Sequence, residues 1–292
     1  MLLPVFEYHR PNSLAEAFEV LDQYGEKAKV LAGGTDLLVN MKRKVAAPDH
    51  VVGLEKLADL TEIQASGDRI GIGALTTAAA LAASSVLKNG TGILAESAGK
   101  LGSPQVRTRA TIGGNLCTAR PAADMPLPLL VLGARVVLAG SGGQREVSID
   151  EFFLGPGETV VRLGEILTSV VIDKPKPGTG GGYMKLGLRR AMEISLVNVA
   201  AAITLDDDGK TIKSAKVALG AVAPTPIRAP QAEKVLAGAK AGDDVFAQAG
   251  LAAAQDAKPI TDHRGSAEYR RDVVAVLTKR ALQAALENGR KQ

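Results

Sequence analysis

Short apolar runs alternate with helical segments between residues 5 and 54, and this alternation constrains the fold more than any other feature of the sequence. Ser13 and Glu16 form a capping-box pattern at the start of the first helix, and Gly25 lies where a helix-ending glycine is expected. Strands separated by helices favour parallel pairing, so the sequence predicts a small βαβ unit over about residues 1–56. Its expected elements are strands at Val5–Tyr8, Lys29–Ala32 and His50–Leu54 and helices at Leu14–Leu21 and Asp36–Lys44.

Beyond residue 56 the pattern changes to short strands mixed with helices, without an internal repeat. Ser66–Asp68 is typical of a hairpin turn, Gly102–Pro126 is a polar, glycine-rich passage, and Lys174–Gly182 is the clearest linker. The sequence therefore predicts an α+β chain, with a first domain over 1–177 and a smaller α+β C-terminal domain over 178–292. The other expected strands are Thr61–Ala65, Arg69–Ile72, Arg135–Leu138, Ile166–Ile172, Tyr183–Leu188, Val197–Leu205 and Ser214–Val222, and the other expected helices are Thr76–Ala83, Ile93–Leu101, Gln231–Leu236, Asp244–Ala254 and Ala267–Glu287.

The composition excludes several classes of protein. With 46% hydrophobic and 23% charged residues, the chain has enough apolar surface to fold as a globular protein. A net charge of +4 is too small to suggest a nucleic-acid partner. Cys117 is the single cysteine, which excludes an internal disulfide and a cysteine-ligated zinc or iron–sulfur site in this chain alone. His9, His50 and His263 are scattered, with no pair at helical ligand spacing, so each is expected as a surface or half-buried histidine rather than a metal ligand.

The sequence predicts no membrane span, because no stretch approaches the ~20 consecutive apolar residues that a bilayer requires. The longest candidate, Leu127–Ala139, is interrupted by Gly133 and Arg135. The residues from Met1 to Glu7 lack the basic region and long apolar run of a signal peptide. We therefore expect a cytoplasmic protein in a reducing compartment.

Two glycine pairs carry most of the chemical information. The first lies in Ala32–Asp36, between a predicted buried strand and a helix, and the second lies in Thr111–Asn115. A Gly-Gly pair lets the backbone approach a ligand and point N–H groups at anionic oxygens, so two such loops could hold a pyrophosphate. Taken singly, each pair is more typical of an ordinary turn, because Gly-Gly commonly interrupts helices and strands. Neither a Walker loop nor a Gly-x-Gly-x-x-Gly fingerprint is present.

Together with their flanks, these segments resemble a known family. The strings AGGTDL at Ala32–Leu37 and TIGGN at Thr111–Asn115 are similar to the two flavin-binding signatures of the FAD-binding medium subunit of molybdenum hydroxylases, which include xanthine dehydrogenase and aerobic carbon monoxide dehydrogenase. The resemblance covers nearly the whole chain. It implies a PCMH-type FAD-binding domain of two subdomains, 1–56 and 57–177, before the C-terminal domain. The further matching segments are Phe6–His9, Gly71–Ala74, Leu163–Leu167, Lys185–Arg190, Ala223–Pro226 and Asp262–Arg270.

The resemblance also implies which residues hold the cofactor. The two glycine segments match those that wrap the FAD pyrophosphate and ribityl chain, and Asp124 matches an aspartate on the adenosine side. Leu167 and Lys185 match positions near the isoalloxazine ring, where a cation would favour an anionic reduced flavin. Read alone, Asp124 could be a turn residue, Lys185 a solvated strand lysine and Cys117 a packed thiol. The implied set is Ala32, Gly33, Gly34, Thr35, Asp36, Thr111, Ile112, Gly113, Gly114, Asn115, Asp124, Leu167 and Lys185, with no catalytic or metal-ligating residue.

The function implied by the resemblance is electron transfer through one non-covalently bound FAD. A large partner subunit would hold a molybdenum–pterin cofactor, a small one two [2Fe–2S] clusters, and the acceptor would be NAD⁺, a quinone or oxygen. A dimer of heterotrimers is expected, with partner contacts near Lys185–Arg190. Thr35-Asp36 stands where carbon monoxide dehydrogenases tend to carry His-Ser, which argues against that substrate. Two alternatives remain: a self-contained FAD oxidoreductase of the same flavin fold, and a non-catalytic flavoprotein module.

Overall fold

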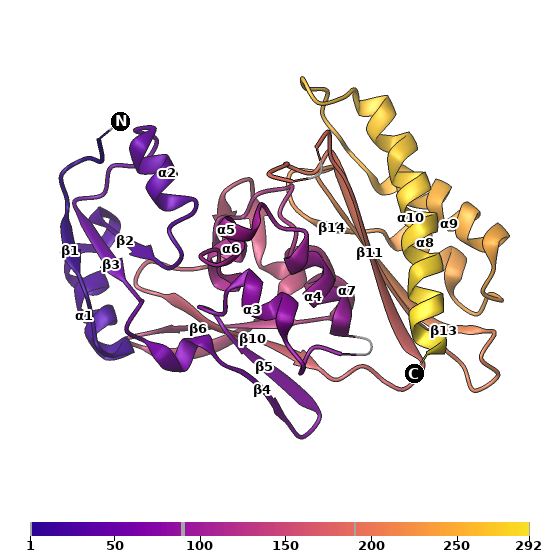
Figure 1. Cartoon of the computed structure of the whole chain (residues 1–292), viewed down its shortest axis with the longest axis horizontal. Helices are drawn as coiled ribbons and strands as arrows, with labels where there is room; N and C mark the ends of the chain where they lie inside the picture. The colour runs from indigo at the N-terminus through magenta and orange to yellow at the C-terminus, as the bar shows by residue number, and fades with distance from the viewer. Residues whose placement is uncertain (1, 89–90, 190, 292) are drawn as a thin grey trace.

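Three regions follow one another along the chain in the computed structural model, which describes residues 2–88, 91–189 and 191–291. Figure 1 shows an N-terminal region in indigo, a central region in purple and magenta, and a C-terminal region in orange and yellow. Each region is built around its own sheet. The mixture of helices and strands confirms the α+β class.

The N-terminal region contains a three-stranded sheet with the strand order β1-β3-β2. Both strand pairs are parallel, as the sequence predicts. Helix α1 begins at Ser13, whose side-chain oxygen accepts a hydrogen bond from the Glu16 backbone N–H, and it ends at Gly25. Ala17 and Leu21 of α1 pack against the sheet in a small aliphatic core. The elements are β1 (Glu7–His9), α1 (Leu14–Tyr24), β2 (Ala28–Leu31), α2 (Leu37–Lys42) and β3 (His50–Gly53).

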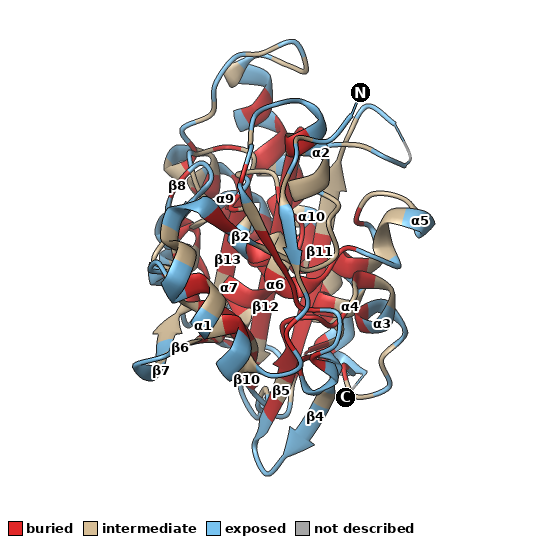
Figure 2. Ribbon diagram, turned by 90° about the vertical axis from the view of Figure 1, so that its left-hand side faces the viewer, coloured by how far each residue is buried: buried red, intermediate tan, exposed pale blue. Residues whose placement is uncertain are grey.

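The central region is a five-stranded antiparallel sheet, in the order β4-β5-β10-β6-β7, with helices beside it. The edge strands β4 and β7 contain no buried residue, whereas β10 between them is mostly buried (Figure 2). The elements are β4 (Ile63–Ser66), β5 (Arg69–Gly73), α3 (Ala78–Ala83), α4 (Gly92–Gly99), α5 (Pro104–Arg107), α6 (Ile112–Cys117), α7 (Pro126–Leu132), β6 (Arg135–Gly140), β7 (Gly143–Ser148), β8 (Phe153–Gly155), β9 (Glu158–Thr159) and β10 (Ile166–Asp173).

The polar, glycine-rich passage Gly102–Pro126, for which the sequence predicts no helix, contains two short helices, α5 and α6. Ser103 and Thr111 start them, since each side-chain oxygen accepts a backbone N–H three residues ahead. Helix α7 follows directly and was not predicted either, because its run of apolar residues has no polar face to give a helical period.

The C-terminal region is a four-stranded antiparallel sheet in the order β11-β12-β13-β14. Alternate residues of β12 enter different cores: Ala200 and Ala202 join the core of the central region, whereas Val199 and Ala201 pack with the C-terminal helices. This sheet is therefore a middle layer, buried on both faces. The elements are β11 (Thr179–Leu186), β12 (Val197–Leu205), β13 (Ile212–Gly220), β14 (Ile227–Arg228), α8 (Pro230–Leu236), α9 (Asp243–Asp256) and α10 (Ala267–Arg290).

The predicted linker Lys174–Gly182 is wrong over its last four residues, which form the start of strand β11. Gly180 and Gly182 lie there because helix α10 approaches the strand closely. A Cβ atom on Gly180 would lie 2.0 Å from the Ala285 carbonyl oxygen of α10, and one on Gly182 would lie 2.3 Å from that of Ala281. Glycine in this strand therefore reflects close packing rather than a flexible connection.

Within residues 2–88, 91–189 and 191–291, none of the helices has the length and apolar character that crossing a membrane requires.

Candidate functional site

A cavity of about 850 Å³ lies between the N-terminal and central regions. Both glycine segments line it, although 75 or more residues separate them in the sequence. The predicted site residues on its wall are Ala32, Gly33, Gly34, Thr35, Asp36, Thr111, Gly113, Gly114, Asn115 and Leu167. Its size falls in the range of ~300–1,000 Å³ that is usual for ligand cavities.

The two glycine segments meet through their backbones. A Cβ atom on Gly33 would lie 1.8 Å from the carbonyl oxygen of Arg109, two residues before the second segment begins. A Cβ atom on Gly113 would lie 2.8 Å from the Cβ of Ala74. Gly34 has a φ of 75°, in the left-handed region that side chains with a Cβ rarely adopt. Glycine at 33 and 113 therefore permits contact between protein segments, whereas Gly34 permits the turn itself.

The first segment offers its backbone N–H groups to a ligand. Helix α2 begins with bonds from the Leu38 N–H to the Gly34 carbonyl and from the Asn40 N–H to the Asp36 carbonyl. In the part of the chain that the structure describes, the N–H groups of Gly33, Gly34 and Thr35 donate to no protein acceptor. Unpaired N–H groups beside a cavity are a binding site for anionic oxygens.

The second segment does not offer its glycine N–H groups, and that part of the sequence interpretation is wrong. Thr111 caps helix α6, and the N–H groups of residues 112–115 are used inside the protein. The Ile112 N–H donates to the Thr76 carbonyl, the Gly113 N–H to the Ala74 carbonyl, and the N–H groups of Gly114 and Asn115 to Thr111. Ile112 is fully buried and does not line the cavity. This segment can therefore contribute side chains and shape.

Asn115 shows directly that the cavity suits a hydrogen-bonding ligand. Its side-chain oxygen is buried and accepts no hydrogen bond from the described residues, while the residue lines the cavity wall. An unsatisfied buried oxygen costs free energy unless a ligand or water donates to it. The ribityl hydroxyls of FAD are donors of this kind, so the residues present fit that cofactor.

A second cavity of about 860 Å³ adjoins the first. Asp36, Asn115 and Arg120 line both, so the two together form an elongated site. Burial raises the pKa of Asp36 and the nearby Arg120 guanidinium opposes that shift. Arg120 was not among the predicted residues. Nothing in a polar passage singles out one arginine, and only the tertiary structure places it between the two cavities.

The first cavity has an apolar part that suits a flat ring system. Leu167, which is 4% exposed, lies on β10 in this wall. Other apolar side chains come from the residues that follow β3 and β5, from α5 and the connection before it, from the start of β10 and from the chain after β11. They are Leu54, Leu75, Leu101, Val106, Ile166 and Ile194. The wall therefore has the character that the resemblance implied for the isoalloxazine end.

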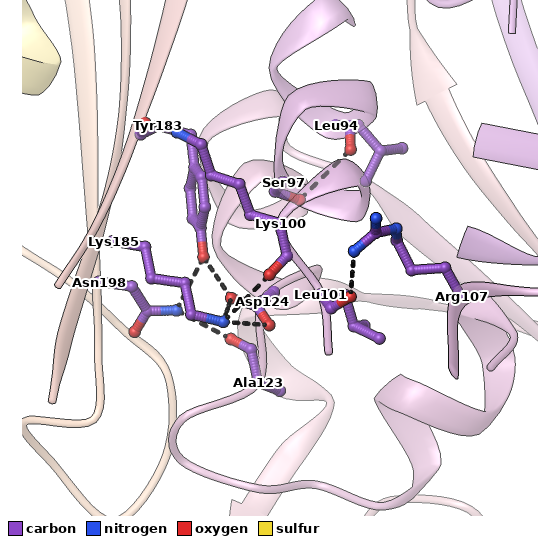
Figure 3. A network of polar contacts seen from close by, with 10 residues as sticks. All are labelled: Leu94, Ser97, Lys100, Leu101, Arg107, Ala123, Asp124, Tyr183, Lys185 and Asn198. Atoms are coloured by element: carbon purple, nitrogen blue, oxygen red, sulfur yellow. Dashed lines mark hydrogen bonds and ion pairs between the residues drawn. The ribbon is translucent and has the colours of Figure 1, made fainter. Parts of the chain in front are cut away.

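Asp124 and Lys185 lie together in a buried network rather than on the wall of the first cavity (Figure 3). The Lys185 ammonium lies 2.9 Å from the Asp124 carboxylate and also donates to the Lys100 carbonyl. Tyr183 donates its hydroxyl proton to Asp124 at 2.6 Å, and Asn198 donates to the Tyr183 oxygen at 3.2 Å. Burial raises the pKa of Asp124, against the opposing charge of Lys185, and raises the pKa of Tyr183 well above its usual value. Tyr183 therefore stays protonated as a donor.

The alternative for Lys185 is wrong, because it is not a solvated strand lysine: only 12% of its side chain is exposed. Asp124 does lie in a bend just before α7, and its carboxylate is in addition a buried ion-pair partner. Asp124 lines the second cavity. Lys185 lines neither cavity and reaches the Lys100 carbonyl, next to Leu101 on the wall of the first. Of the basic run 185–190, Arg189 is paired with Glu193, and residue 190 lies outside the described residues.

Cys117 lines the first cavity as an exposed residue. The protein around its sulfur desolvates the thiol and raises its pKa to about 12, so the sulfur itself is packed, as the sequence suggested. The thiol therefore stays protonated and is a poor nucleophile at neutral pH.

Comparison with known proteins agrees with this geometry. Residues 4–175 match the family described as FAD binding domain in molybdopterin dehydrogenase, and residues 183–285 match the CO dehydrogenase flavoprotein C-terminal domain. The chain is 38% identical over 280 residues to the carbon monoxide dehydrogenase medium chain of Afipia carboxidovorans, with 96% of each chain covered. It is 32% identical over 281 residues to the xanthine dehydrogenase FAD-binding subunit of Escherichia coli O157:H7, which covers 96% of this chain and 95% of that one.

A solved structure supports the same relationship. The carbon monoxide dehydrogenase of Hydrogenophaga pseudoflava that lacks the Mo-pyranopterin moiety of the molybdenum cofactor matches with a TM-score of 0.95, 35% identity and 99% coverage of both chains. The two glycine segments, the paired cavities and the full-length similarity lead to one conclusion: the chain belongs to the FAD-binding medium subunits of molybdenum hydroxylases and is a flavoprotein subunit of an oxidoreductase.

Proposed function

We propose that this chain carries electrons from the [2Fe–2S] clusters of a small partner subunit to an external acceptor, within a complex whose large subunit oxidises the organic substrate at a molybdenum–pterin cofactor. The observation that carries the proposal is the elongated double cavity, which has free N–H groups on one wall and apolar side chains on another. When bound, FAD supplies the chemistry that links one-electron donors to a one- or two-electron acceptor.

The chain's own residues hold the cofactor in a defined order. The N–H groups of Gly33–Thr35 bind the pyrophosphate, with Arg120 supplying a neighbouring positive charge. Asn115 accepts from ribityl hydroxyls, Leu167 covers the flavin ring, and Asp124 lies toward the adenosine side in the second cavity. Apolar side chains around a flavin exclude water and affect its redox potential.

The flavin is held without a covalent bond. Cys117 is the cysteine on the cavity wall, and a thiol with a pKa of about 12 has almost no thiolate at neutral pH to attack the ring. Precipitation of the purified chain with acid is therefore expected to release all the yellow colour into the supernatant. Colour that stays with the precipitated protein would show a covalent attachment.

The proposed assembly is a dimer of heterotrimers in the cytoplasm, with NAD⁺, a quinone or oxygen as acceptor. The relatives act in different dehydrogenases, yet this chain aligns with them over nearly its whole length. Since similar subunits of nearly the same length occur in enzymes with different substrates, the substrate is expected to react in another chain of the complex. This chain is 38% identical to a carbon monoxide dehydrogenase medium chain. The residues Thr35-Asp36 nevertheless make carbon monoxide a weaker candidate substrate than that identity suggests.

Purification of the native complex tests the proposal. We expect this chain to co-purify with two other subunits, and we expect the complex to show molybdenum, the absorption of [2Fe–2S] clusters and one FAD per chain. Substrate should bleach the flavin of the complex and leave the flavin of the isolated chain oxidised. A panel of carbon monoxide, purines, aldehydes and N-heteroaromatic compounds serves as substrate.

Each alternative predicts a different result in the same experiment. Reduction of the isolated chain by an organic substrate would replace the proposal with a self-contained FAD oxidoreductase. A flavin that stays oxidised in the complete complex, while substrate reduces the iron–sulfur clusters, would indicate a non-catalytic flavoprotein module.

A further inference from the structure

Glu7, His9 and His50 form a cluster on the N-terminal sheet, away from the flavin site. Glu7 and His9 lie on β1, and because side chains alternate along a strand they point to the same face. His50 lies on β3, directly opposite Glu7 in the parallel register. None of the three lines either cavity. No sequence pattern connects the two histidines, since 41 residues separate them.

The distances within the cluster are those of metal ligands. His9 Nε2 lies 3.1 Å from His50 Nδ1, and the Glu7 carboxylate oxygens lie 3.9 Å from the first and 3.5 Å from the second. A tetrahedral zinc ion with bonds of about 2.0–2.1 Å separates its ligand atoms by roughly 3.3–3.4 Å. The ligand atoms all lie within 4.8 Å of one another, so a small movement of the Glu7 carboxylate lets one divalent cation contact all three residues.

The surroundings hold the two imidazoles in place. The Tyr24 ring stacks on His50 with 3.6 Å between ring centroids and lies 5.4 Å from His9. The two histidine side chains are 17% and 15% exposed, whereas Glu7 is 63% exposed. The imidazoles are thus fixed before a ligand arrives, and the carboxylate is free to close over it from the solvent side.

Without a cation, the pair of ring nitrogens has a limited use. His9 Nε2 and His50 Nδ1 can share one proton in a single hydrogen bond. Among the described residues, the Glu7 carboxylate has no cationic partner except these two histidines, and then only if one of them is protonated. Two neutral imidazole nitrogens and a carboxylate are a common ligand set for zinc, with an open fourth position for water.

We propose that Glu7, His9 and His50 form a site for a zinc-type divalent cation that fastens strand β1 to strand β3. The opposite face of β1 already has a connection of its own, because Tyr8 and Arg10 both donate to Glu55. The cation completes the attachment of the first strand from the other side of the sheet.

Metal binding to the full-length, FAD-loaded chain without a histidine tag tests this site. Equilibrium dialysis against Zn²⁺ with elemental analysis should give one zinc per chain with a dissociation constant in the micromolar range or tighter. His9→Gln and His50→Gln should each weaken zinc binding by at least ~10-fold. Loss of a residue that only supports a metal ligand already costs about that much, and these two residues would contact the zinc directly. His263→Gln, which changes the remaining histidine, should leave binding unchanged.

A thermal shift gives a second measurement that does not depend on activity. Zn²⁺ should raise the melting temperature of the wild-type chain and of His263→Gln, because a ligand that binds the folded state stabilises it, and should not raise that of His50→Gln. Glu7→Gln removes the carboxylate charge and keeps the shape of an exposed side chain. If a histidine variant fails to retain FAD, zinc binding by Glu7→Gln therefore still tests the site. Absence of stoichiometric zinc in the wild-type chain, or equal binding by Glu7→Gln and wild type, would overturn the proposal.

Discussion

At the scale of single residues, the site depends on a few positions where backbone geometry decides the chemistry. Gly34 holds a left-handed conformation that turns the chain out of β2, and this turn leaves three neighbouring N–H groups unpaired at the cavity. A residue with a Cβ would disfavour that turn. The anion-binding role proposed for the first segment therefore depends on one backbone angle.

Gly34→Ala should weaken FAD binding by on the order of tenfold, since the unfavourable φ costs about 1 kcal/mol or more and the new Cβ would lie 2.9 Å from Leu38. Fluorescence titration of the apoprotein with FAD measures the change. Gly142→Ala is the matched control, because that glycine has open space around it and no left-handed φ. Equal affinities in the two variants would contradict the role given to Gly34.

Gly114→Val should abolish FAD binding and leave most of the fold intact. The first Cβ atom would lie 2.9 Å from the Thr111 Oγ that caps helix α6, and the branched side chain would extend into the cavity that Gly114 lines. FAD content after purification and the far-ultraviolet circular dichroism spectrum separate the two effects. A variant that retains FAD at the wild-type level would show that this segment only shapes the protein.

At the scale of elements, glycines in β11 and an ion pair at the start of α10 fix the C-terminal layer. Strand β11 lies between α10 and α4, with Gly181 facing Ile93 and its neighbours facing α10. An ion pair connects the segment before α10 to the start of that helix: Arg270 donates to the Asp262 carboxylate and to the carbonyls of Leu196 and Ala221. The matching segment Asp262–Arg270 of the sequence is therefore a structural anchor as well as a wall of the second cavity.

Gly182→Ala should destabilise the protein by roughly 1–3 kcal/mol, because its Cβ would overlap the backbone of α10 and force the helix away from the strand. Urea unfolding measures the loss. Gly71→Ala is the control in another strand, where the nearest atom to the new Cβ is 4.0 Å away. A stability equal to that of Gly71→Ala would contradict the close packing of β11 and α10.

Asp262→Asn should destabilise the protein by no more than about 2 kcal/mol near neutral pH, with solvent screening reducing the effect of this partly exposed pair. Burial acts to raise the pKa of Asp262, but the Arg264 N–H and the Arg270 guanidinium outweigh it and lower the pKa to about 2. The folded pKa lies below the unfolded value of about 3.9, so the stabilisation is complete above about pH 4 and is lost as the pH falls through about 2. Urea unfolding should therefore show a smaller difference between wild type and variant at pH 3 than at pH 6. A constant difference would show that ionisation of Asp262 contributes nothing.

At the scale of the whole molecule, the C-terminal sheet is joined to the central region by a shared core and a buried polar network. Tyr183 of β11 and Ala200 of β12 belong to the same core cluster as Ile112 and Leu127. The Tyr183 hydroxyl also bonds to Asp124, which precedes α7. Since apolar and polar contacts both cross between the regions, we expect them to unfold in one transition.

Tyr183→Phe should lower the free energy of unfolding by roughly 1–3 kcal/mol, because the buried Asp124 carboxylate loses a donor. Urea unfolding followed by circular dichroism and by flavin fluorescence should give one coincident transition, shifted to lower urea. Tyr269→Phe, at a residue that is 50% exposed, should change stability by less than about 0.5 kcal/mol. Two separate transitions in the wild-type protein would contradict the shared core.

Much of the element order could be predicted from the sequence because periodicity and capping are local properties. The strand Val197–Leu205 has the same bounds in the prediction and in the structure, and Ser13 and Gly25 bound the first helix as expected. The parallel sheet follows from strands separated by helices, and the two glycine segments were recognisable by their residues. For these features, the deciding interactions lie within a few residues of one another.

The tertiary structure alone decided the features that depend on distant segments. Thr111–Asn115 is a helix start with its N–H groups occupied because Ala74 and Thr76 happen to lie beside it. Gly180–Gly182 is a packed strand because α10, about a hundred residues later, lies against it. His9 and His50 meet through strand register, and Arg120 reaches both cavities through the path of the chain. A local pattern records which conformation a segment favours, whereas burial, pairing and site geometry are set by what the rest of the chain brings next to it.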